Sequence, residues 1–162
     1  MTTLVLLRHG LTAITGPVLA GRTPGVHLDD RGIAQAAEAA KRLAGVNLAA
    51  IVSSPLERCQ ETAEAVAVAN GMSVETEPRL VECGYGDWTG QELKKLAKEP
   101  LWKVVQGHPS AARFPGPEGE SIADMSARAV AAVREWNTLI AAEHGPEAVW
   151  ARSSRSERVQ SS

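Results

Sequence analysis

Cysteine is scarce in this sequence of 162 residues, which contains only Cys59 and Cys83. The two residues form no CxxC pair and no disulfide framework, which excludes the class of small disulfide-stabilised secreted domains. They are also too few to form a Cys-rich structural zinc site. We therefore expect a protein that works in a reducing compartment, the cytoplasm.

The sequence also lacks an excess of positive charge and a long hydrophobic run. Lys and Arg number 17 against 19 Asp and Glu, which gives a formal net charge of -2. This balance argues against binding to nucleic acid or to an anionic membrane through bulk positive charge. The early apolar run over residues 4–7 ends at Arg8 and is too short for a signal peptide or a transmembrane helix. We expect neither nucleic acid nor a membrane as a partner.

The remaining composition is typical of one globular domain, with 44% hydrophobic and 22% charged residues. Apolar runs typical of buried strands alternate with segments whose apolar residues recur at helical spacing. This alternation predicts an α/β fold, a three-layer α/β/α sandwich with a mostly parallel sheet. The expected order is a strand at 3–7, a helix at 29–45, a strand at 48–52, a helix at 56–71, a strand at 74–76, a helical segment at 91–107 broken at Pro100, a long helix at 121–145 and a strand from 148.

The last twelve residues, ARSSRSERVQSS, differ in composition from the rest of the chain. They contain five Ser and three Arg, and only Ala151 and Val159 are apolar. A buried strand that starts at residue 148 should continue in apolar residues, and this one does not. The sequence therefore predicts a domain over residues 1–150 and a disordered polar tail over 151–162.

Arg8, His9 and Gly10 directly follow the first predicted strand. Ligands of open α/β sheets bind beyond the carboxyl ends of the strands, so these residues lie where a site would form. Gly10 would let the backbone turn and approach a ligand closely. By themselves, however, the three residues are more typical of a histidine that caps a strand beside a solvated arginine.

Two further segments favour a site at this edge. Arg58 lies in the first turn of the helix that follows the second strand, where a guanidinium opposes the helix dipole but can bind phosphate through two donors. Glu82 lies in a glycine-rich irregular segment, LVECGYGDWTG. The alternative for Glu82 is an ordinary acidic residue on a surface loop.

Taken together, the segments LVLLRHG (4–10), SSPLERCQETA (53–63) and LVECGYGDWTG (80–90) resemble the histidine phosphatase superfamily, the phosphoglycerate-mutase-like proteins. Gly21-Arg22 and Gly119-Glu120-Ser121 also fit that family's pattern. The resemblance covers roughly residues 3–150 and extends to the phosphomutases of actinobacteria. It implies the phosphoglycerate-mutase-like fold and a phosphatase or phosphomutase that acts on a small phosphorylated substrate.

The resemblance also implies the role of each site residue. His9 would be the nucleophile that forms a phosphohistidine, and Glu82 would protonate the leaving oxygen. Arg8 and Arg58 would bind the phosphate oxygens, and Thr15 would add a hydroxyl where the family commonly has Asn. No metal and no cofactor are implied, because the guanidinium groups supply the positive charge.

The sequence departs from the family pattern near its C-terminal end. The family has a second active-site histidine after a late strand, but this sequence has no histidine beyond His144. Family members also continue with at least one more strand, so we expect a chain truncated at its C-terminus, with C-terminal strands missing. The alternative function is therefore a catalytically impaired remnant that binds phosphate weakly.

We expect Arg8, His9, Arg58 and Glu82 to converge on one pocket at the carboxyl ends of the strands. The substrate itself and the choice between phosphatase and mutase do not follow from the sequence. Specificity would depend on the loops over 11–27 and 99–118, which carry no readable motif. The sequence also does not indicate an oligomeric state.

Overall fold

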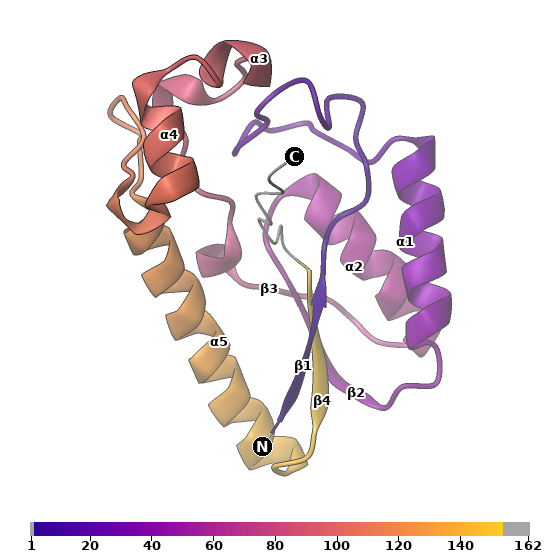
Figure 1. The fold of residues 1–162 in the computed structure, drawn as a ribbon. Helices are drawn as coiled ribbons and strands as arrows, with labels where there is room; N and C mark the ends of the chain where they lie inside the picture. Colours follow the sequence, from indigo (N-terminus) through magenta and orange to yellow (C-terminus); the bar gives the residue numbers. More distant parts are fainter. Residues whose placement is uncertain (1, 154–162) are drawn as a thin grey trace.

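The computed structural model describes residues 2–153 and contains one parallel sheet with helices on both faces (Figure 1). The strands are β1 (Thr3–Leu7), β2 (Leu48–Ser53), β3 (Glu75–Thr76) and β4 (Val149–Ser153), in the order β1-β4-β2-β3. The α-helices are α1 (Asp30–Leu43), α2 (Glu57–Asn70), α3 (Leu93–Leu96), α4 (Pro100–Gly107) and α5 (Ile122–His144). Three short 3₁₀ helices, η1 (Pro78–Leu80), η2 (Gly86–Trp88) and η3 (Pro109–Ala111), interrupt the long connections.

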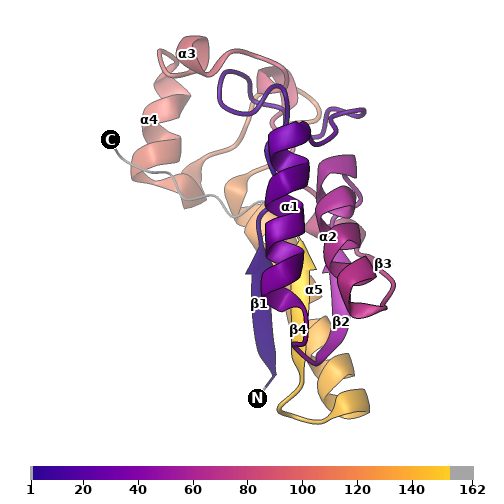
Figure 2. The same ribbon diagram turned by 90° about the vertical axis from the view of Figure 1, so that its right-hand side faces the viewer.

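The elements form three layers. Helices α1 and α2 lie side by side on one face of the sheet, and α5 covers the other face (Figures 1 and 2). Helices α3 and α4 lie beyond the carboxyl ends of the strands, together with the loop between β1 and α1 (Figures 1 and 2). The predicted α/β/α sandwich with a mostly parallel sheet is confirmed, and it places two long connections over the edge where a ligand would bind.

Strand β4 is the central strand and corrects the predicted domain boundary at residue 150. It pairs with β1 on one side and β2 on the other, and the strand continues through Ser153. Ala151 and Ser153 are fully buried, and the Ser153 hydroxyl donates to the carbonyl oxygen of Cys59 at 3.0 Å. Composition misled the prediction because the ladder hydrogen bonds on both sides come from the backbone and hold a polar sequence in place. The rest of the predicted tail, residues 154–162, lies outside the described residues.

Apolar side chains fill both sides of the sheet and a third space beyond its edge. Ile51 and Val66 belong to the core between the sheet and α1–α2, whereas Trp150 and Ile140 belong to the core under α5. The third core lies under α3 and α4 and is rich in aromatic residues, with Tyr85, Trp88 and Phe114 in edge-on contacts. The last core supports the connections that carry the site, because Leu19 of the β1–α1 loop packs into it.

The helix boundaries follow from the expected local signals. Asp29 caps α1 by accepting from the Gly32 amide, Ser121 caps α5 by accepting from the Asp124 amide, and Pro100 separates α3 from α4. Ile33 is an exception: the helical pattern predicts a core position, but the side chain is 57% exposed. Within the described part of the chain, no helix has the length and apolar content to cross a membrane.

Candidate active site

The three longest strands end at the same level of the sheet, and their following residues build the site. Leu7 of β1, Ser153 of β4 and Ser53 of β2 are register partners at the last position of each strand. Arg8 and His9 therefore leave the sheet beside the segment that leads into α2. The topology brings together two motifs that lie about fifty residues apart in the sequence.

His9 and Arg58 are in direct contact. The Arg58 Nε donates to the His9 Nε2 at 3.3 Å, and the His9 Nδ1 lies 2.7 Å from the Gly10 carbonyl oxygen. A guanidinium has no acceptor, so His9 Nε2 must carry its lone pair, and Nδ1 must carry the proton that it gives to the carbonyl. This geometry assigns a neutral imidazole with a nucleophilic Nε2 atom.

Arg58 is a buried cation, and not all of its N–H donors are hydrogen-bonded. Its side chain is almost completely buried, and Nη2 donates to the Gly21 carbonyl oxygen at 2.7 Å. Nη1 is also buried and has no hydrogen-bond partner within residues 2–153. A buried charged donor left without a partner costs free energy, and an anion beside it would recover that cost.

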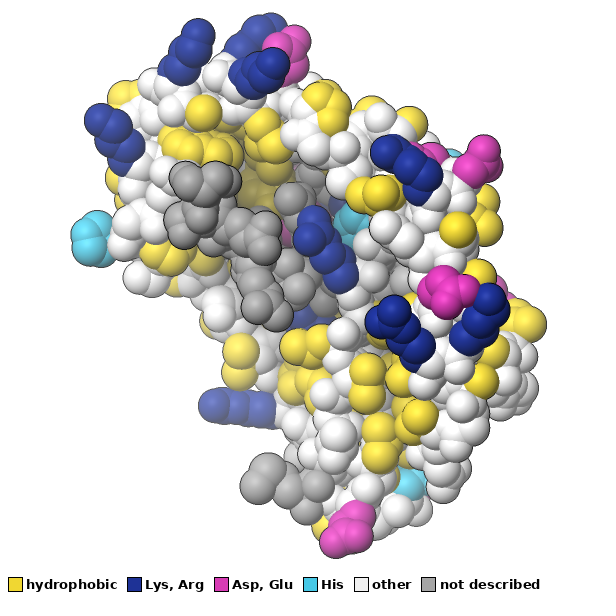
Figure 3. Space-filling view, turned by 45° about the vertical axis from the view of Figure 1, so that its right-hand side comes forward, with side chains coloured by type: hydrophobic (Ala, Val, Ile, Leu, Met, Phe, Trp, Pro, Cys, Tyr) yellow, Lys and Arg dark blue, Asp and Glu magenta, His cyan; other side chains and the backbone are white. Residues whose placement is uncertain are grey.

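A cavity of about 130 Å³ contains four of the five predicted site residues, Arg8, His9, Thr15 and Arg58. The rest of its lining consists of Thr12, Gly16, Val18, Ala20 and Leu93. On the face shown in Figure 3, a histidine side chain lies beside a Lys or Arg side chain. The combination of two guanidinium groups, hydroxyl groups and a neutral imidazole suits a small oxyanion.

Thr15 and Thr12 form a hydroxyl pair in the wall of this cavity. The two Oγ1 atoms lie 2.9 Å apart, and the Thr12 amide also donates to Thr15 Oγ1 at 2.9 Å. Thr12 is buried, although the sequence pattern does not single it out. When Thr12 supplies the proton between the two oxygens, the Thr15 proton is available to a ligand in the cavity.

Glu82 is not among the described residues that line this cavity, but it connects to Arg58 through the Gly21-Arg22 segment. The Glu82 carbonyl oxygen accepts from Arg22 Nε at 2.7 Å, and Gly21 supplies the carbonyl that binds Arg58. The carboxylate Oε1 accepts from the Tyr85 hydroxyl at 3.2 Å. The convergence of Glu82 with His9 on one pocket stays a prediction.

The electrostatics of Cys59 also link Arg58 and Glu82. Burial raises the pKa of the Cys59 thiol to about 11, the charge of Arg58 lowers it, and the charge of Glu82 raises it. The charge of Glu82 therefore acts on the first turn of α2. The high pKa keeps this cysteine in its thiol form, which makes it an unreactive packing residue.

Gly10 lies in close contact with helix α1. A Cβ atom on Gly10 would lie 2.5 Å from the Gly32 carbonyl oxygen, so the glycine is needed for close packing against α1. The Gly10 amide donates to the Thr62 hydroxyl at 3.1 Å, and that hydroxyl donates to the Arg58 carbonyl oxygen at 2.8 Å. Thr62 thus joins the two motifs, and its helical spacing of four from Arg58 was the available signal.

Two glutamates of α2 anchor the loop that carries the cavity wall. Glu57 accepts from the Gly25 amide at 2.9 Å, and Glu61 accepts from the Leu28 amide at 2.8 Å. Glu61 also binds the Nδ1 of His27, and this hydrogen bond and the charge of Glu61 raise the pKa of His27 above 6.5. Within residues 2–153, no group of three or more His, Cys, Asp or Glu side chains is arranged to hold a metal ion.

Comparison with known proteins gives consistent matches. Residues 4–151 match the model of the histidine phosphatase superfamily, branch 1. The chain is 44% identical over 77 residues to an uncharacterized protein of Mycobacterium tuberculosis, covering 48% of this chain and 38% of that protein. It is 33% identical over 136 residues to the probable phosphoglycerate mutase GpmB of Yersinia pestis, covering 82% of this chain and 62% of that protein. The chain thus spans less than two thirds of the length of each of these relatives.

A solved structure has the same fold. The native structure of a mycobacterial glucosyl-3-phosphoglycerate phosphatase superposes with a TM-score of 0.80 and 28% sequence identity. The match covers 93% of this chain and 73% of that chain. The similarity therefore includes the sheet, the helices on both of its faces and the connections beyond its carboxyl edge.

Proposed function

Because the chain belongs to branch 1 of the histidine phosphatase superfamily, we propose that it acts on a phosphomonoester through a covalent phosphohistidine at His9. The observation that carries the proposal is the contact between His9 Nε2 and Arg58 Nε at 3.3 Å. This contact leaves the imidazole neutral, as nucleophilic attack requires, and holds a cation beside the reacting atom.

In the first step, His9 Nε2 attacks the phosphorus atom, and the bond between phosphorus and the leaving oxygen breaks. Arg8 and Arg58 bind the phosphoryl oxygens, and the buried Nη1 of Arg58 supplies hydrogen bonds that strengthen as negative charge develops. The Thr15 hydroxyl donates to a further oxygen. The product of this step is phosphorylated His9 and a leaving group that needs a proton.

Glu82 supplies that proton and then reverses its role. Its carboxylic acid protonates the leaving oxygen, and the resulting carboxylate removes a proton from the incoming water. Water attacks the phosphohistidine, the bond between phosphorus and nitrogen breaks, and inorganic phosphate leaves. A second substrate hydroxyl in place of water would give phosphomutase chemistry, whereas hydrolysis needs no retained product.

The proposal is tested by hydrolysis of p-nitrophenyl phosphate. We expect His9→Ala to reduce kcat by roughly 10³-fold or more, because the nucleophile is lost. His144→Ala is the matched control, since His144 ends α5 at the far side of the sheet from the cavity. A covalent phosphoprotein detected by intact mass in the wild type, and absent from His9→Ala, would identify the intermediate. Turnover that survives His9→Ala would refute the proposal.

The second candidate function is phosphate binding without turnover. It is favoured by the small number of histidines at the cavity. The sequence has four histidines, and within the described residues only His9 lines the cavity. The family pattern contains a second histidine at the phosphate. Loss of one preorganised donor typically costs roughly 10²–10³-fold in rate.

The two functions differ in how they respond to vanadate. Under the second candidate, vanadate would bind weakly in a calorimetric titration, and p-nitrophenyl phosphate would not be cleaved above background. Binding would then depend on Arg58 but tolerate His9→Asn. Turnover that depends on His9 would reject this candidate.

A further inference from the structure

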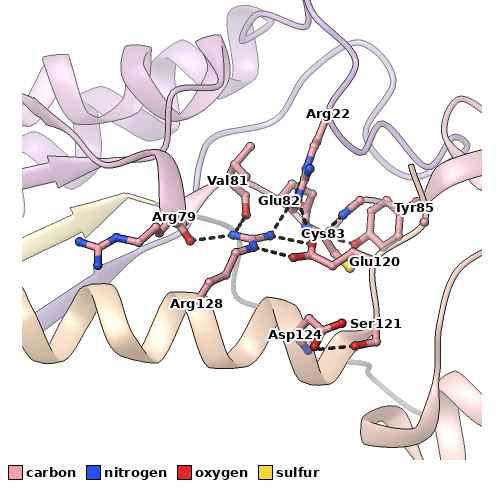
Figure 4. Close-up of polar contacts among 12 residues, drawn as sticks. Arg22, Arg79, Val81, Glu82, Cys83, Tyr85, Glu120, Ser121, Asp124 and Arg128 are labelled. Carbon is pink, nitrogen blue, oxygen red and sulfur yellow. Dashed lines mark hydrogen bonds and ion pairs between the residues drawn. The ribbon is translucent and has the colours of Figure 1, made fainter. Parts of the chain in front are cut away.

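A single arginine of α5 holds the backbone of the segment that carries Glu82. Arg128 Nη1 donates to the carbonyl oxygens of Arg79 at 2.7 Å and Val81 at 2.8 Å, and Nη2 donates to that of Glu82 at 3.1 Å (Figure 4). The segment after η1 belongs to no helix or strand up to η2. Its carbonyl groups therefore take their partners from a side chain instead of from a ladder.

Glu120 orients the Arg128 guanidinium. Its carboxylate accepts from Arg128 Nε at 2.7 Å and from Arg128 Nη2 at 2.9 Å, which is the two-point geometry of a strong arginine–carboxylate pair (Figure 4). Burial opposes ionisation of Glu120, but the hydrogen bonds from Arg128 and from the Gly84 amide outweigh it and lower the pKa of Glu120. The pair is therefore charged at neutral pH, and Arg128 has little rotational freedom.

Arg22 completes the support from the opposite side. It donates through Nε to the Glu82 carbonyl oxygen at 2.7 Å and through Nη2 to Glu120 at 2.9 Å. Two guanidinium groups thus converge on one carbonyl oxygen, one from the β1–α1 loop and one from α5. The Gly84 amide also donates to Glu120, at 3.1 Å, so the backbone is bound on both sides of Cys83.

These contacts restrict the Glu82 side chain as well as its backbone. Glu82 Oε1 accepts from the Cys83 amide at 3.1 Å and from the Tyr85 hydroxyl at 3.2 Å. The Cys83 amide and the Glu82 carbonyl group, to which Arg22 and Arg128 donate, belong to the same peptide unit. A rotation of that peptide would move the donor and release the carboxylate.

We propose that Arg128, oriented by Glu120, is a positioning residue that sets the Glu82 carboxyl group for proton transfer to the leaving oxygen. This inference rests on the proposed function, in which Glu82 protonates the leaving group. Arg128 is not among the described residues that line the cavity; it binds the backbone of 79–82, and its charge also interacts with that of Glu82. A catalytic group placed on an irregular segment needs such a second layer of contacts to keep its geometry.

The inference predicts a defect that depends on the leaving group. An alkyl alkoxide leaves poorly without a proton, whereas p-nitrophenolate is a stable anion that leaves without one. Misplacement of Glu82 therefore slows hydrolysis of glycerol 2-phosphate more than hydrolysis of p-nitrophenyl phosphate. A change in phosphate binding or in folding would slow both substrates alike.

The decisive variant is Arg128→Lys, which keeps the charge but cannot serve three carbonyl groups and a carboxylate in one plane. We expect kcat/KM for glycerol 2-phosphate, which reports the phosphoryl transfer that releases the alkoxide, to fall roughly 10- to 100-fold, in the range of a misplacement of about 1 Å. The change for p-nitrophenyl phosphate should be several-fold smaller. Arg134→Lys is the matched control, because Arg134 is an exposed arginine on the same helix.

Glu82→Gln and the double variant Arg128→Lys/Glu82→Gln test whether Arg128 acts through Glu82. We expect Glu82→Gln to slow the alkyl substrate by about 10²-fold or more, as loss of a general acid does. The double variant should then be no slower than Glu82→Gln alone. Additive losses would overturn the inference.

Amide hydrogen exchange gives a readout that is independent of activity. Arg128→Lys and Glu120→Gln should speed exchange at Cys83 and Gly84, with Glu118→Gln, an exposed neighbour, as the control. Unchanged exchange, or an equal loss of kcat/KM on both substrates, would overturn the inference. The proposed function would still stand if turnover depends on His9. A wild type that cleaves neither substrate would refute the proposed function, and the catalytic role of Arg128 would fall with it.

Discussion

At the scale of single residues, Arg58 is a buried cation whose hydrogen bonds are incomplete. Arg58 is 2% exposed, and its guanidinium donates from one nitrogen to His9 and from another to the Gly21 carbonyl oxygen. The third nitrogen has no partner among residues 2–153. Burial of an incompletely bonded charge destabilises the fold locally, and a bound phosphoryl group would offset that loss.

We therefore expect Arg58→Lys to impair the site although it keeps the charge. An ammonium group is a compact donor that cannot bind His9, Gly21 and an oxyanion in one plane. The expected loss in kcat is roughly 10²–10³-fold, with weaker vanadate binding. Steady-state kinetics with p-nitrophenyl phosphate measures it, beside Arg42→Lys, an exposed arginine of α1. An Arg58→Lys enzyme with wild-type kcat would contradict the role assigned to the guanidinium fork.

Gly32 gives a second residue-scale prediction, in which packing reverses the usual sign of a substitution. Gly→Ala inside a helix ordinarily stabilises by about 0.5–1 kcal/mol. At Gly32 the added Cβ would collide with the backbone of Leu11, in the loop next to His9. We expect Gly32→Ala to destabilise the protein by about 1–3 kcal/mol in urea unfolding.

Gly107 provides the control for that experiment. It is the last residue of α4, and a Cβ there would meet nothing within 4 Å. Gly107→Ala should leave the free energy of unfolding unchanged or slightly raised. If Gly32→Ala were as stable as Gly107→Ala, the loop around Leu11 would have to move to accommodate the Cβ atom without loss of unfolding free energy, and the prediction would be wrong.

At the scale of elements, helix α2 organises the site by holding both a motif and a loop. Its first turn presents Arg58, and Glu57 and Glu61 bind the amides of Gly25 and Leu28 in the loop that walls the cavity. The same loop also contacts the segment that carries Glu82, because Arg22 donates to the Glu82 carbonyl oxygen. Movement of this loop would therefore change the cavity and the support of Glu82 together.

The contact between His27 and Glu61 makes part of this anchoring depend on pH. A partner that raises the pKa of a histidine stabilises the folded protein. The stabilisation is complete at pH values below the unfolded-state pKa of about 6.5 and is lost as the pH rises through the folded-state pKa. We expect His27 to titrate above 6.5 in a histidine NMR titration. Glu61→Gln should lower the midpoint of the His27 titration. Glu64→Gln, an exposed glutamate about one turn further along α2, should not. A midpoint unaffected by Glu61→Gln would contradict the pairing.

At the scale of the whole molecule, Glu77 ties the sheet to α5. Its side chain accepts from Arg79 Nε at 2.9 Å and Nη2 at 2.7 Å and from the Trp136 indole at 3.2 Å. The hydrogen bonds from Arg79 lower the pKa of Glu77 to about 2 although burial opposes them. The Glu77 amide also donates to Ser53 at the end of β2, so the carboxylate stabilises the join between two layers.

This shift predicts how global stability depends on acid. A carboxyl group whose pKa is lowered by folding stabilises the protein at pH values above its unfolded pKa of about 4.5. This stabilisation is lost as the pH falls toward 2, and for Glu77 it amounts to at most about 3 kcal/mol in the free energy of unfolding. Glu77→Gln should be less stable than the wild type at pH 7, and the difference should shrink between pH 4.5 and 2 in urea unfolding. Glu75→Gln, an exposed neighbour on β3, should stay within about 0.5 kcal/mol at every pH. A constant difference across that range would contradict the assignment.

The sequence by itself determined the features that depend on local pattern. The caps at Asp29 and Ser121, the break at Pro100 and the alternation of apolar runs with amphipathic segments led to the correct layers. These features are readable because a cap or a helical face involves residues within a few positions of one another. The motifs around His9 and Arg58 were readable for the same reason.

The tertiary structure alone decided the features that depend on long-range partners. Composition predicted that the domain ends at residue 150, but backbone hydrogen bonds with two neighbouring strands extend β4 to Ser153. Thr62, Glu120 and Arg128 acquire their roles from contacts with segments far away in the sequence. A hydroxyl or a guanidinium looks the same on a solvated surface and in a buried network, because only the fold supplies the carbonyl groups and carboxylates that it binds.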